Sequence, residues 1–306
     1  MTLSETDAPL ASRTILVTDS GLGGLSVFND IANRLTKGSP WPRVKLVYFN
    51  AWPAPHRGYN HFDAMERRVR VFDNALNAMA AFDPDVILIA CNTLSAIYPR
   101  TPFCQASPIP VEGIVDHGVQ MIYANLMADP GSKAVILGTP TTIAARSHES
   151  ALVGLGIARE RIINIGCTDL AGWIEREPFS ETVGQMIRNF VQEAATALGD
   201  FSGRVVAALC CTHFGYRQAL FEAAFAEFIR ATVTILNPNV RMARRVFADV
   251  NPSRWATAQV DMHIVSKAVW TEAQVKAYLK LLPDISAATR GALKGYTLDP
   301  ELFSVD

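Results

Sequence analysis

Short apolar runs that end in small or polar residues recur along the chain, and longer amphipathic segments separate many of them. In 63–82, for example, Val69, Phe72, Leu76 and Met79 repeat at intervals of three or four, which predicts a helix with one apolar face. Buried strands alternating with amphipathic helices indicate parallel sheets with crossover helices. The predicted strands lie within 14–21, 45–51, 85–93, 110–116, 133–142, 161–167, 205–213 and 232–237.

Two pairs of these strands are related by one constant offset in the sequence. The segment 13–19 overlays 133–139, and 85–91 overlays 205–211, each 120 residues later. Apolar residues match anywhere, but two pairs at one offset, with cysteine on cysteine, are harder to attribute to chance. We therefore interpret the chain as two related α/β halves.

The ends of the related strands carry the candidate functional residues. Ligands of open parallel sheets bind beyond the carboxyl ends of the strands. If the two halves face each other, Asp19, Cys91, Thr139 and Cys211 point into one cleft. Consecutive residues near a strand end point to opposite faces, so Cys210 is expected to be a small buried residue instead.

Length and composition fit this picture. A chain of 306 residues predicts two domains of roughly 100 to 200 residues each. The 28 basic and 29 acidic residues nearly cancel, so we expect a small-molecule partner rather than nucleic acid or an anionic membrane surface. The N-terminus lacks the apolar core of a signal peptide, and the apolar runs are too short to span a bilayer. The five cysteines are an odd number spread over a long chain, unlike the even, closely spaced cysteines of a secreted disulfide-rich protein. These features predict a cytoplasmic protein with reduced thiols.

Two thiols on opposite walls of a cleft suggest a specific chemistry. A carbon between them can lose a proton to one thiolate and receive one from the other thiol. A thiol, with a reference pKa of roughly 8.5, becomes useful near neutrality when a neighbouring group lowers that pKa. His213 lies two residues from Cys211, and Asp19 ends the strand predicted to lie beside Cys91. Each thiol thus has a candidate proton partner.

The segment DSGLGGLS (19–26) follows a strand and is expected to open a helix, which suits an anion. It fails the dinucleotide fingerprint, because Ser26 replaces the third glycine, and it lacks the P-loop lysine. We therefore expect this segment to bind a carboxylate rather than a pyrophosphate. The alternative is that these glycines serve only a tight turn.

Other interpretations of the cysteines remain open. Either one alone is more simply explained as a packing residue. A zinc site would use Cys91, Cys210, Cys211 and His213, but adjacent cysteines point apart and no CxxC spacing occurs, so no metal is expected. A cysteine hydrolase would use Cys211 or Cys91 as nucleophile, His213 as base and Asp19 as orienting group, which leaves the second thiol unexplained. The remaining cysteines are interpreted as structural: Cys104 and Cys167.

Four motifs together resemble the glutamate racemase family of the aspartate/glutamate racemase superfamily: DSGLGG (19–24), ACNTLSA (90–96), GTPTTI (138–143) and CTHF (211–214). The similarity runs from about residue 13 to about 245, with a weaker echo at 263–279. The resemblance implies a cofactor-independent isomerase of two pseudo-symmetric α/β domains, with one cysteine from each domain flanking the substrate Cα.

The resemblance also implies roles for individual residues. Cys91 would act on the D-enantiomer and Cys211 on the L-enantiomer, with Asp19 and His213 assisting proton movement. The positions expected to contact the substrate are Ser20, Asn92, Thr93, Thr139, Thr212, Arg57 and Gly58.

The family's chain starts in one domain, crosses to the second and returns. This predicts a flexible N-terminus over 1–12, a first domain of 13–112 plus 230–306, and an inserted domain of 113–229. The implied partner is an acidic amino acid, the implied product in a bacterium is D-glutamate for peptidoglycan in the cell wall, and a homodimer is a further expectation.

The chain departs from the family's pattern in three places. It has Pro55-His56-Arg57-Gly58 where the family has Pro-Tyr-Gly, so Arg57 replaces a tyrosine that helps to bind the side-chain carboxylate. An arginine can hold a carboxylate bidentately. Gly215 and His148 replace a usual proline and tyrosine. Glutamate racemisation is the leading hypothesis; the alternatives are racemisation, isomerisation or decarboxylation of aspartate or another acid, and non-catalytic binding of acidic metabolites.

Overall fold

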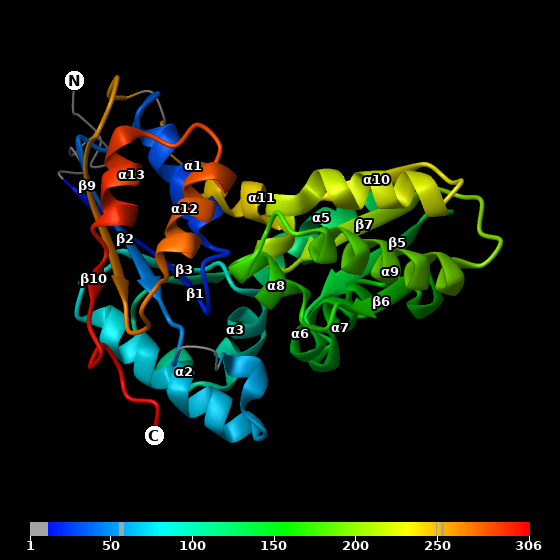
Figure 1. Cartoon of the computed structure of the whole chain (residues 1–306), viewed down its shortest axis with the longest axis horizontal. Helices are drawn as coiled ribbons and strands as arrows, with labels where there is room; N and C mark the ends of the chain where they lie inside the picture. The colour runs from blue at the N-terminus through cyan, green and yellow to red at the C-terminus, as the bar shows by residue number, and fades with distance from the viewer. Residues whose placement is uncertain (1–11, 55–57, 249, 252–253) are drawn as a thin grey trace, which may run out of the picture.

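The chain folds into two parallel sheets, each covered by helices on both faces (Figure 1). The structure is a computed structural model, which describes residues 12–54, 58–248, 250–251 and 254–306. The first sheet has the strand order β10-β9-β2-β1-β3-β4 and the second has the order β6-β5-β7-β8. The strands are β1 (Arg13–Asp19), β2 (Arg43–Asn50), β3 (Val86–Ile89), β4 (Val111–Gly113), β5 (Lys133–Gly138), β6 (Ile162–Gly166), β7 (Val205–Cys210), β8 (Val233–Leu236), β9 (Gln259–Ser266) and β10 (Thr297–Leu298).

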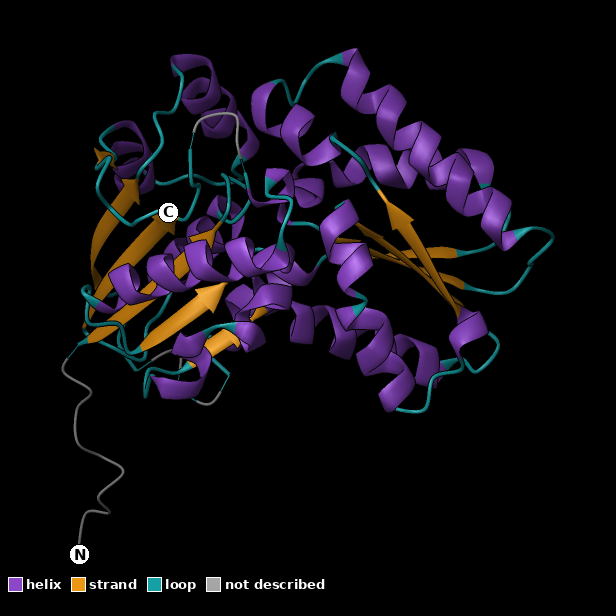
Figure 2. Ribbon diagram, turned by 90° about the horizontal axis from the view of Figure 1, so that it is seen from below, coloured by secondary structure: helices purple, strands orange, loops and turns teal. Residues whose placement is uncertain are grey.

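Helices enclose both sheets, as Figure 2 shows from below. One face of the first sheet packs against α1, α12 and α13, and its other face packs against α2 and α3. The second sheet lies between α5 and α7 on one face and α8, α9 and α10 on the other. The α-helices are α1 (Leu25–Leu35), α2 (Met65–Ala80), α3 (Asn92–Ile97), α4 (Pro102–Ala106), α5 (Ile114–Ala128), α6 (Pro140–Ala145), α7 (Ser147–Gly154), α8 (Leu170–Arg176), α9 (Glu181–Leu198), α10 (Gln218–Phe228), α11 (Pro238–Arg245), α12 (Glu272–Leu281) and α13 (Ala287–Lys294).

The burial of both faces explains why the strands are almost wholly apolar. In β1, Ile15 and Val17 join the core on the α1 side, whereas Leu16 between them joins the core on the α2 side. All of the strand pairings within the two sheets are parallel in the described chain, so the carboxyl ends of neighbouring strands meet at one edge. Asp19 and Cys210 end the central strands β1 and β7.

The predicted alternation of strands and helices is confirmed for the eight predicted strands and for the helix within 63–82. Two differences concern the C-terminal part. The strand β8 was expected in the first domain, but it pairs with β7, so the second sheet extends to Leu236 rather than ending before residue 230. The strands β9 and β10 were not predicted, and they extend the first sheet beyond β2. The expected flexible N-terminus lies outside the described residues except for Ser12.

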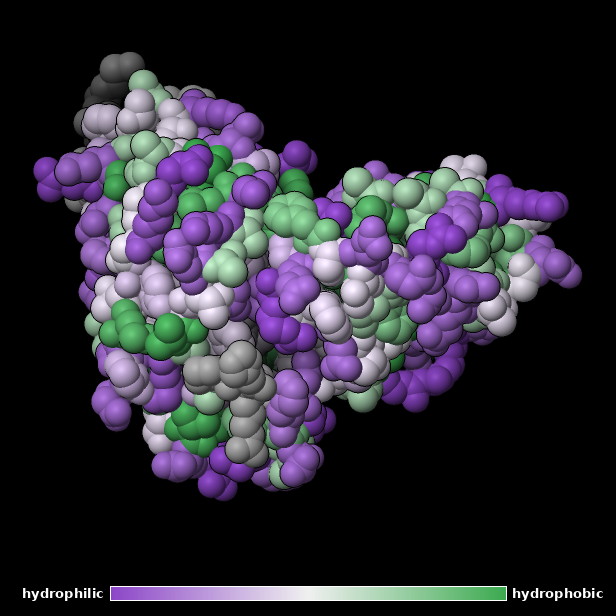
Figure 3. Space-filling view, in the orientation of Figure 1, coloured by the Kyte–Doolittle hydropathy of each residue, from purple (hydrophilic) through white to green (hydrophobic). Residues whose placement is uncertain are grey.

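Much of the visible face carries hydrophilic side chains over two lobes (Figure 3). Within the described segments, no helix combines the length and apolar character needed to cross a membrane.

Cys210, the last residue of β7, and Cys211, which follows it, point to opposite faces of the second sheet, as the alternation predicted. Cys210 packs with Val206 and Ala208 on the α5 side, and Cys211 packs with Phe214 and the helices on the other side. Cys210 is fully buried. Burial raises the pKa of its thiol above the ordinary range, so Cys210 stays neutral.

We expect Cys210→Ser to lower the free energy of unfolding by about 1–3 kcal/mol, because a hydroxyl replaces a thiol in an apolar layer. Urea denaturation followed by far-UV circular dichroism measures the change. The matched control is Cys104→Ser, because the side chain of Cys104 is only partly buried and the same exchange should cost less there. Equal stability of Cys210→Ser and the unmodified protein would contradict the packing role.

Candidate functional site

The carboxyl ends of β1, β3, β5 and β7 meet at a cavity of about 50 Å3 between the two sheets. This volume holds only a few water molecules, so the cleft is nearly closed. Its lining includes nine of the residues that the sequence predicted: Asp19, Ser20, Cys91, Asn92, Thr93, Thr139, Cys211, Thr212 and His213. It also includes Asn60, Thr142, Ala171 and Cys210. Gly58 is described but does not line the cavity, and Arg57 lies outside the described residues.

Cys91 follows β3 and caps the amino end of α3. Its Sγ lies 3.1 Å from Oγ of Ser20. Burial and the charge of Asp19 raise the pKa of Cys91 to about 12, although hydrogen bonds from Ser20 and from backbone amides oppose the shift. Cys91 is therefore a protonated thiol in this closed cleft, which suits the role of proton donor.

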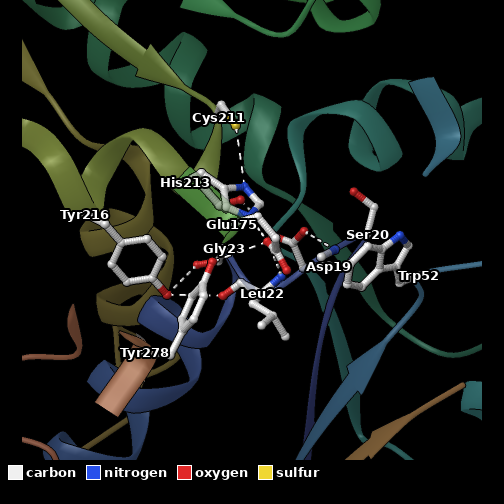
Figure 4. Close-up of polar contacts among 12 residues, drawn as sticks. Asp19, Ser20, Leu22, Gly23, Trp52, Glu175, Cys211, His213, Tyr216 and Tyr278 are labelled. Carbon is white, nitrogen blue, oxygen red and sulfur yellow. Dashed lines mark hydrogen bonds and ion pairs between the residues drawn. The ribbon is translucent and has the colours of Figure 1, made fainter. Parts of the chain in front are cut away.

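Cys211 lies on the opposite wall, in contact with His213. The imidazole Nδ1 is 3.8 Å from Cys211 Sγ, and Nε2 forms a short contact with Oε2 of Glu175 (Figure 4). Burial opposes protonation of His213, but the carboxylate of Glu175 and the thiol of Cys211 outweigh it and raise the pKa of His213 well above its ordinary value. The three side chains form a chain along which a proton can move to or from Cys211.

Asp19 is the second buried carboxylate of the site, and it connects the two halves. Its Oδ2 accepts a hydrogen bond of 2.8 Å from the hydroxyl of Thr212, and its Oδ1 accepts one of 3.0 Å from the amide of Gly21. Burial raises the pKa of Asp19, against the opposing charge of His213 and the hydrogen bond from Thr212. Asp19 was expected beside Cys91; its charge does act on Cys91, but its hydroxyl partner belongs to the other half of the protein.

Three threonine hydroxyls meet at another wall of the cavity. Thr93 comes from the first half, and Thr139 and Thr142 come from the loop and the first turn of α6. Their Oγ1 atoms lie 3.0–3.2 Å from one another. Beside them, both side-chain polar atoms of Asn92 are buried and have no hydrogen-bond partner among the described residues. The Asn92 side chain is therefore free to bind the polar atoms of a small molecule, and the three hydroxyls line the same cavity.

Glu175 contacts His213 and is a residue of the site that the sequence analysis did not identify. It lies in α8, is 5 % exposed, and belongs to no recognisable motif. Glu175 directly follows the apolar Ile174 in the sequence. The local pattern of apolar and polar residues does not predict that its side chain is buried. Thr142 was also missed, although its position three residues after the helix-capping Thr139 gave a usable signal.

The geometry also bears on the alternatives. Among the residues that the structure places, no group of three or more histidine, cysteine or acidic side chains is arranged to hold a metal ion. In the hydrolase alternative, Asp19 would orient His213. The structure contradicts this role, because Nε2 of His213 contacts Glu175, whereas Asp19 accepts a hydrogen bond from Thr212.

The two halves approach closely at Gly23, in the loop between β1 and α1. A Cβ atom there would lie 2.8 Å from both Thr212 Cβ and His213 Nδ1, inside van der Waals contact. We expect Gly23→Ala to lower the free energy of unfolding by about 1–3 kcal/mol, because the added methyl group overpacks the junction. Thermal or urea denaturation measures the loss.

The matched control is Gly184→Ala in α9, where an added Cβ meets nothing within 4 Å. There alanine should be neutral or stabilising, by up to about 1 kcal/mol, because of its higher helix propensity. If both variants unfold alike, the junction is looser than the structure indicates.

Comparison with known proteins agrees with this geometry. Residues 15–240 match the family model described as Asp/Glu/Hydantoin racemase. A glutamate racemase of Vibrio vulnificus is 29% identical over 275 residues, which cover 88% of this chain and 93% of the relative. The solved glutamate racemase of Francisella tularensis in complex with D-glutamate superimposes with a TM-score of 0.66 at 17% identity, covering 96% of this chain and 98% of that one. An aspartate racemase of Picrophilus torridus shares the fold with a TM-score of 0.52 at 14% identity, covering 77% of this chain and 92% of that one.

The family match covers most of the chain and spans both sheets, including the ends of β1, β3, β5 and β7 that line the cavity. The chain therefore belongs to the Asp/Glu/Hydantoin racemase family, and it is a racemase.

Proposed function

We propose that the protein interconverts L- and D-glutamate by moving a proton at Cα between two thiols. The observation that carries this proposal is the placement of Cys91 and Cys211 at the strand ends of two different sheets, on one shared cavity. A substrate between them presents one face of Cα to each thiol. A two-base racemisation needs this arrangement, because the proton leaves one face and another proton arrives at the opposite face.

In the direction from L to D, Cys211 takes the Cα proton as a thiolate. The imidazole Nδ1 of His213 lies 3.8 Å from Cys211 Sγ, and Glu175 stabilises the protonated imidazolium at the other ring nitrogen. His213 can therefore accept the thiol proton of Cys211 before the reaction, which leaves the thiolate that takes the Cα proton. In the direction from D to L, the imidazolium can reprotonate Cys211 after its thiol has delivered a proton to Cα.

Cys91 delivers the second proton to the opposite face. Its thiol is protonated in the closed cleft and is oriented by the hydroxyl of Ser20. When Cys91 has given up its proton, the adjacent hydroxyl can stabilise the thiolate by hydrogen bonding, whereas the charge of Asp19 opposes the thiolate and favours its reprotonation. In the direction from D to L the two cysteines exchange roles.

The substrate's polar groups have candidate partners on several walls. Asn92 offers two unpartnered side-chain atoms, and the hydroxyls of Ser20, Thr93, Thr139 and Thr212 line the cavity. Thr142 and Asn60 add polar side chains that the sequence analysis did not assign. Arg57 and Gly58 remain candidates for the side-chain carboxylate, on the strength of the resemblance to glutamate racemases.

The resemblance also supports three wider proposals. The enzyme would work in the cytoplasm, supply D-glutamate for peptidoglycan synthesis in a bacterium, and assemble as a homodimer. Analytical ultracentrifugation of the purified chain tests the last of these: a single species of one-chain mass would exclude the homodimer.

Incubation with L-glutamate in deuterated water tests the reaction itself. We expect deuterium at Cα together with D-glutamate, both followed by NMR and chiral chromatography. A parallel incubation with L-aspartate tests the substrate, since exchange on aspartate alone would transfer the proposal to that acid. Binding of either acid without Cα exchange would favour the metabolite-binding alternative.

Single substitutions test the two thiols. Cys91→Ser and Cys211→Ser should each lower racemisation at least about 100-fold, because a serine hydroxyl is a far weaker acid and base near neutrality. Cys210→Ser, measured below its unfolding transition, should keep near-normal turnover and serves as the matched control. Full activity of Cys211→Ser would disprove the two-thiol scheme.

A further inference from the structure

Glu175 connects the catalytic imidazole to a segment far away in the sequence. Its Oε2 accepts a hydrogen bond of 3.0 Å from the amide of Leu22 and one of 3.2 Å from the hydroxyl of Tyr278, in addition to the short contact with His213. Its other oxygen, Oε1, is buried and has no hydrogen-bond partner within the described part of the chain. All the described polar contacts of this carboxylate therefore fall on one oxygen.

Tyr278 lies in α12, which packs against the first sheet, whereas Glu175 lies in α8, which packs against the second sheet (Figures 1 and 4). The phenol is fully buried, and its ring packs edge-on against Tyr216, with centroids 5.3 Å apart at 88°. A capping box of Thr271 and Gln274 fixes the start of α12. The hydroxyl is thus held in place before any substrate binds.

The phenol can only donate to the carboxylate. Burial, followed by the charge of Glu175 and the neighbouring Tyr216, Tyr48 and Asp19, raises the pKa of Tyr278 well above its ordinary value, so the hydroxyl keeps its proton. A donated hydrogen bond stabilises the ionised form of Glu175 and reduces its pull on the proton of His213.

We infer that Tyr278 is a positioning residue for proton transfer: its hydroxyl holds the Glu175 carboxylate in register with His213 and thereby sets how readily the imidazole exchanges a proton with Cys211. The inference concerns only the Cys211 side of the cleft, because no described hydrogen bond joins Tyr278 to Cys91 or Ser20. Its kinetic consequences rest on the proposed racemisation, whereas its effect on His213 does not.

Tyr278→Phe tests the inference, since it keeps the ring and removes only the hydroxyl. The turnover number should fall about 10-fold with each enantiomer, at nearly constant KM, as expected for the loss of one hydrogen bond to a charged group. The primary isotope effect should rise with Cα-deuterated L-glutamate but not with Cα-deuterated D-glutamate, because only the Cys211 step is slowed. Equal isotope effects on both enantiomers, or normal turnover, would overturn the inference.

A second measurement needs no substrate. NMR of histidine-labelled protein, with His213 assigned from His213→Gln, follows the titration of the His213 imidazole. Without the phenol the carboxylate is a stronger hydrogen-bond acceptor, so His213 should hold its proton more tightly and titrate at higher pH in Tyr278→Phe. An unchanged midpoint overturns the inference even if the protein proves inactive on glutamate, which separates its failure from that of the proposed function.

The matched control is Tyr296→Phe. The Tyr296 hydroxyl also makes a hydrogen bond within the C-terminal segment, where it accepts the amide of Trp270 at 2.9 Å. It has no described contact with Glu175 or His213. Tyr296→Phe should lose comparable thermal stability but keep the normal isotope effects and the normal titration midpoint; an equal response of both variants would indicate a merely structural role for Tyr278.

Discussion

Two carboxylates are buried where the two sheets meet, and the rest of the site depends on how they are compensated. An ionised carboxylate is costly to remove from water unless hydrogen bonds or opposite charges replace its hydration. Asp19 belongs to the first half and is held by Thr212 of the second; Glu175 belongs to the second half and is held by Leu22 and Tyr278 of the first. Each carboxylate therefore has a hydrogen-bond donor across the cleft, besides a partner in its own half, Gly21 for Asp19 and His213 for Glu175. The arrangement of the halves and the electrostatics of the site thus stabilise each other.

This reciprocity gives the two thiols different surroundings. Cys91 faces a hydroxyl and a nearby negative charge, and its pKa is raised. Cys211 faces an imidazole whose proton is stabilised by a carboxylate. The fold is repeated, but the groups that serve the two thiols are not, so the pseudo-symmetry concerns the strands and the cysteines rather than the proton partners. The close approach of the loop at Gly23 lets Thr212 and His213 reach both carboxylates.

The sequence predicted much of the fold because both faces of most strands are buried. Continuous apolar runs such as β1, β3, β5 and β7 stand out in such sheets, and polar residues at their ends mark the edge where ligands bind. The strand β9 was missed because the side chains of its first five residues are exposed or partly exposed, so its sequence mixes polar and apolar residues and forms no continuous apolar run. The boundary near β8 was misplaced because periodicity identifies a strand but not the sheet that it joins.

By itself, the sequence determined the two α/β halves, because apolar periodicity identifies the strands and helices. The constant offset made Cys91 and Cys211 equivalent positions, and the alternation of side chains along a strand placed Cys210 in the packed layer. Only the tertiary structure brought Glu175 and Tyr278 to His213, the candidate partner of Cys211. Glu175 and Tyr278 are 103 residues apart in the chain and belong to different halves. The contact between them depends on how the two domains pack against each other, and local sequence patterns do not predict that packing.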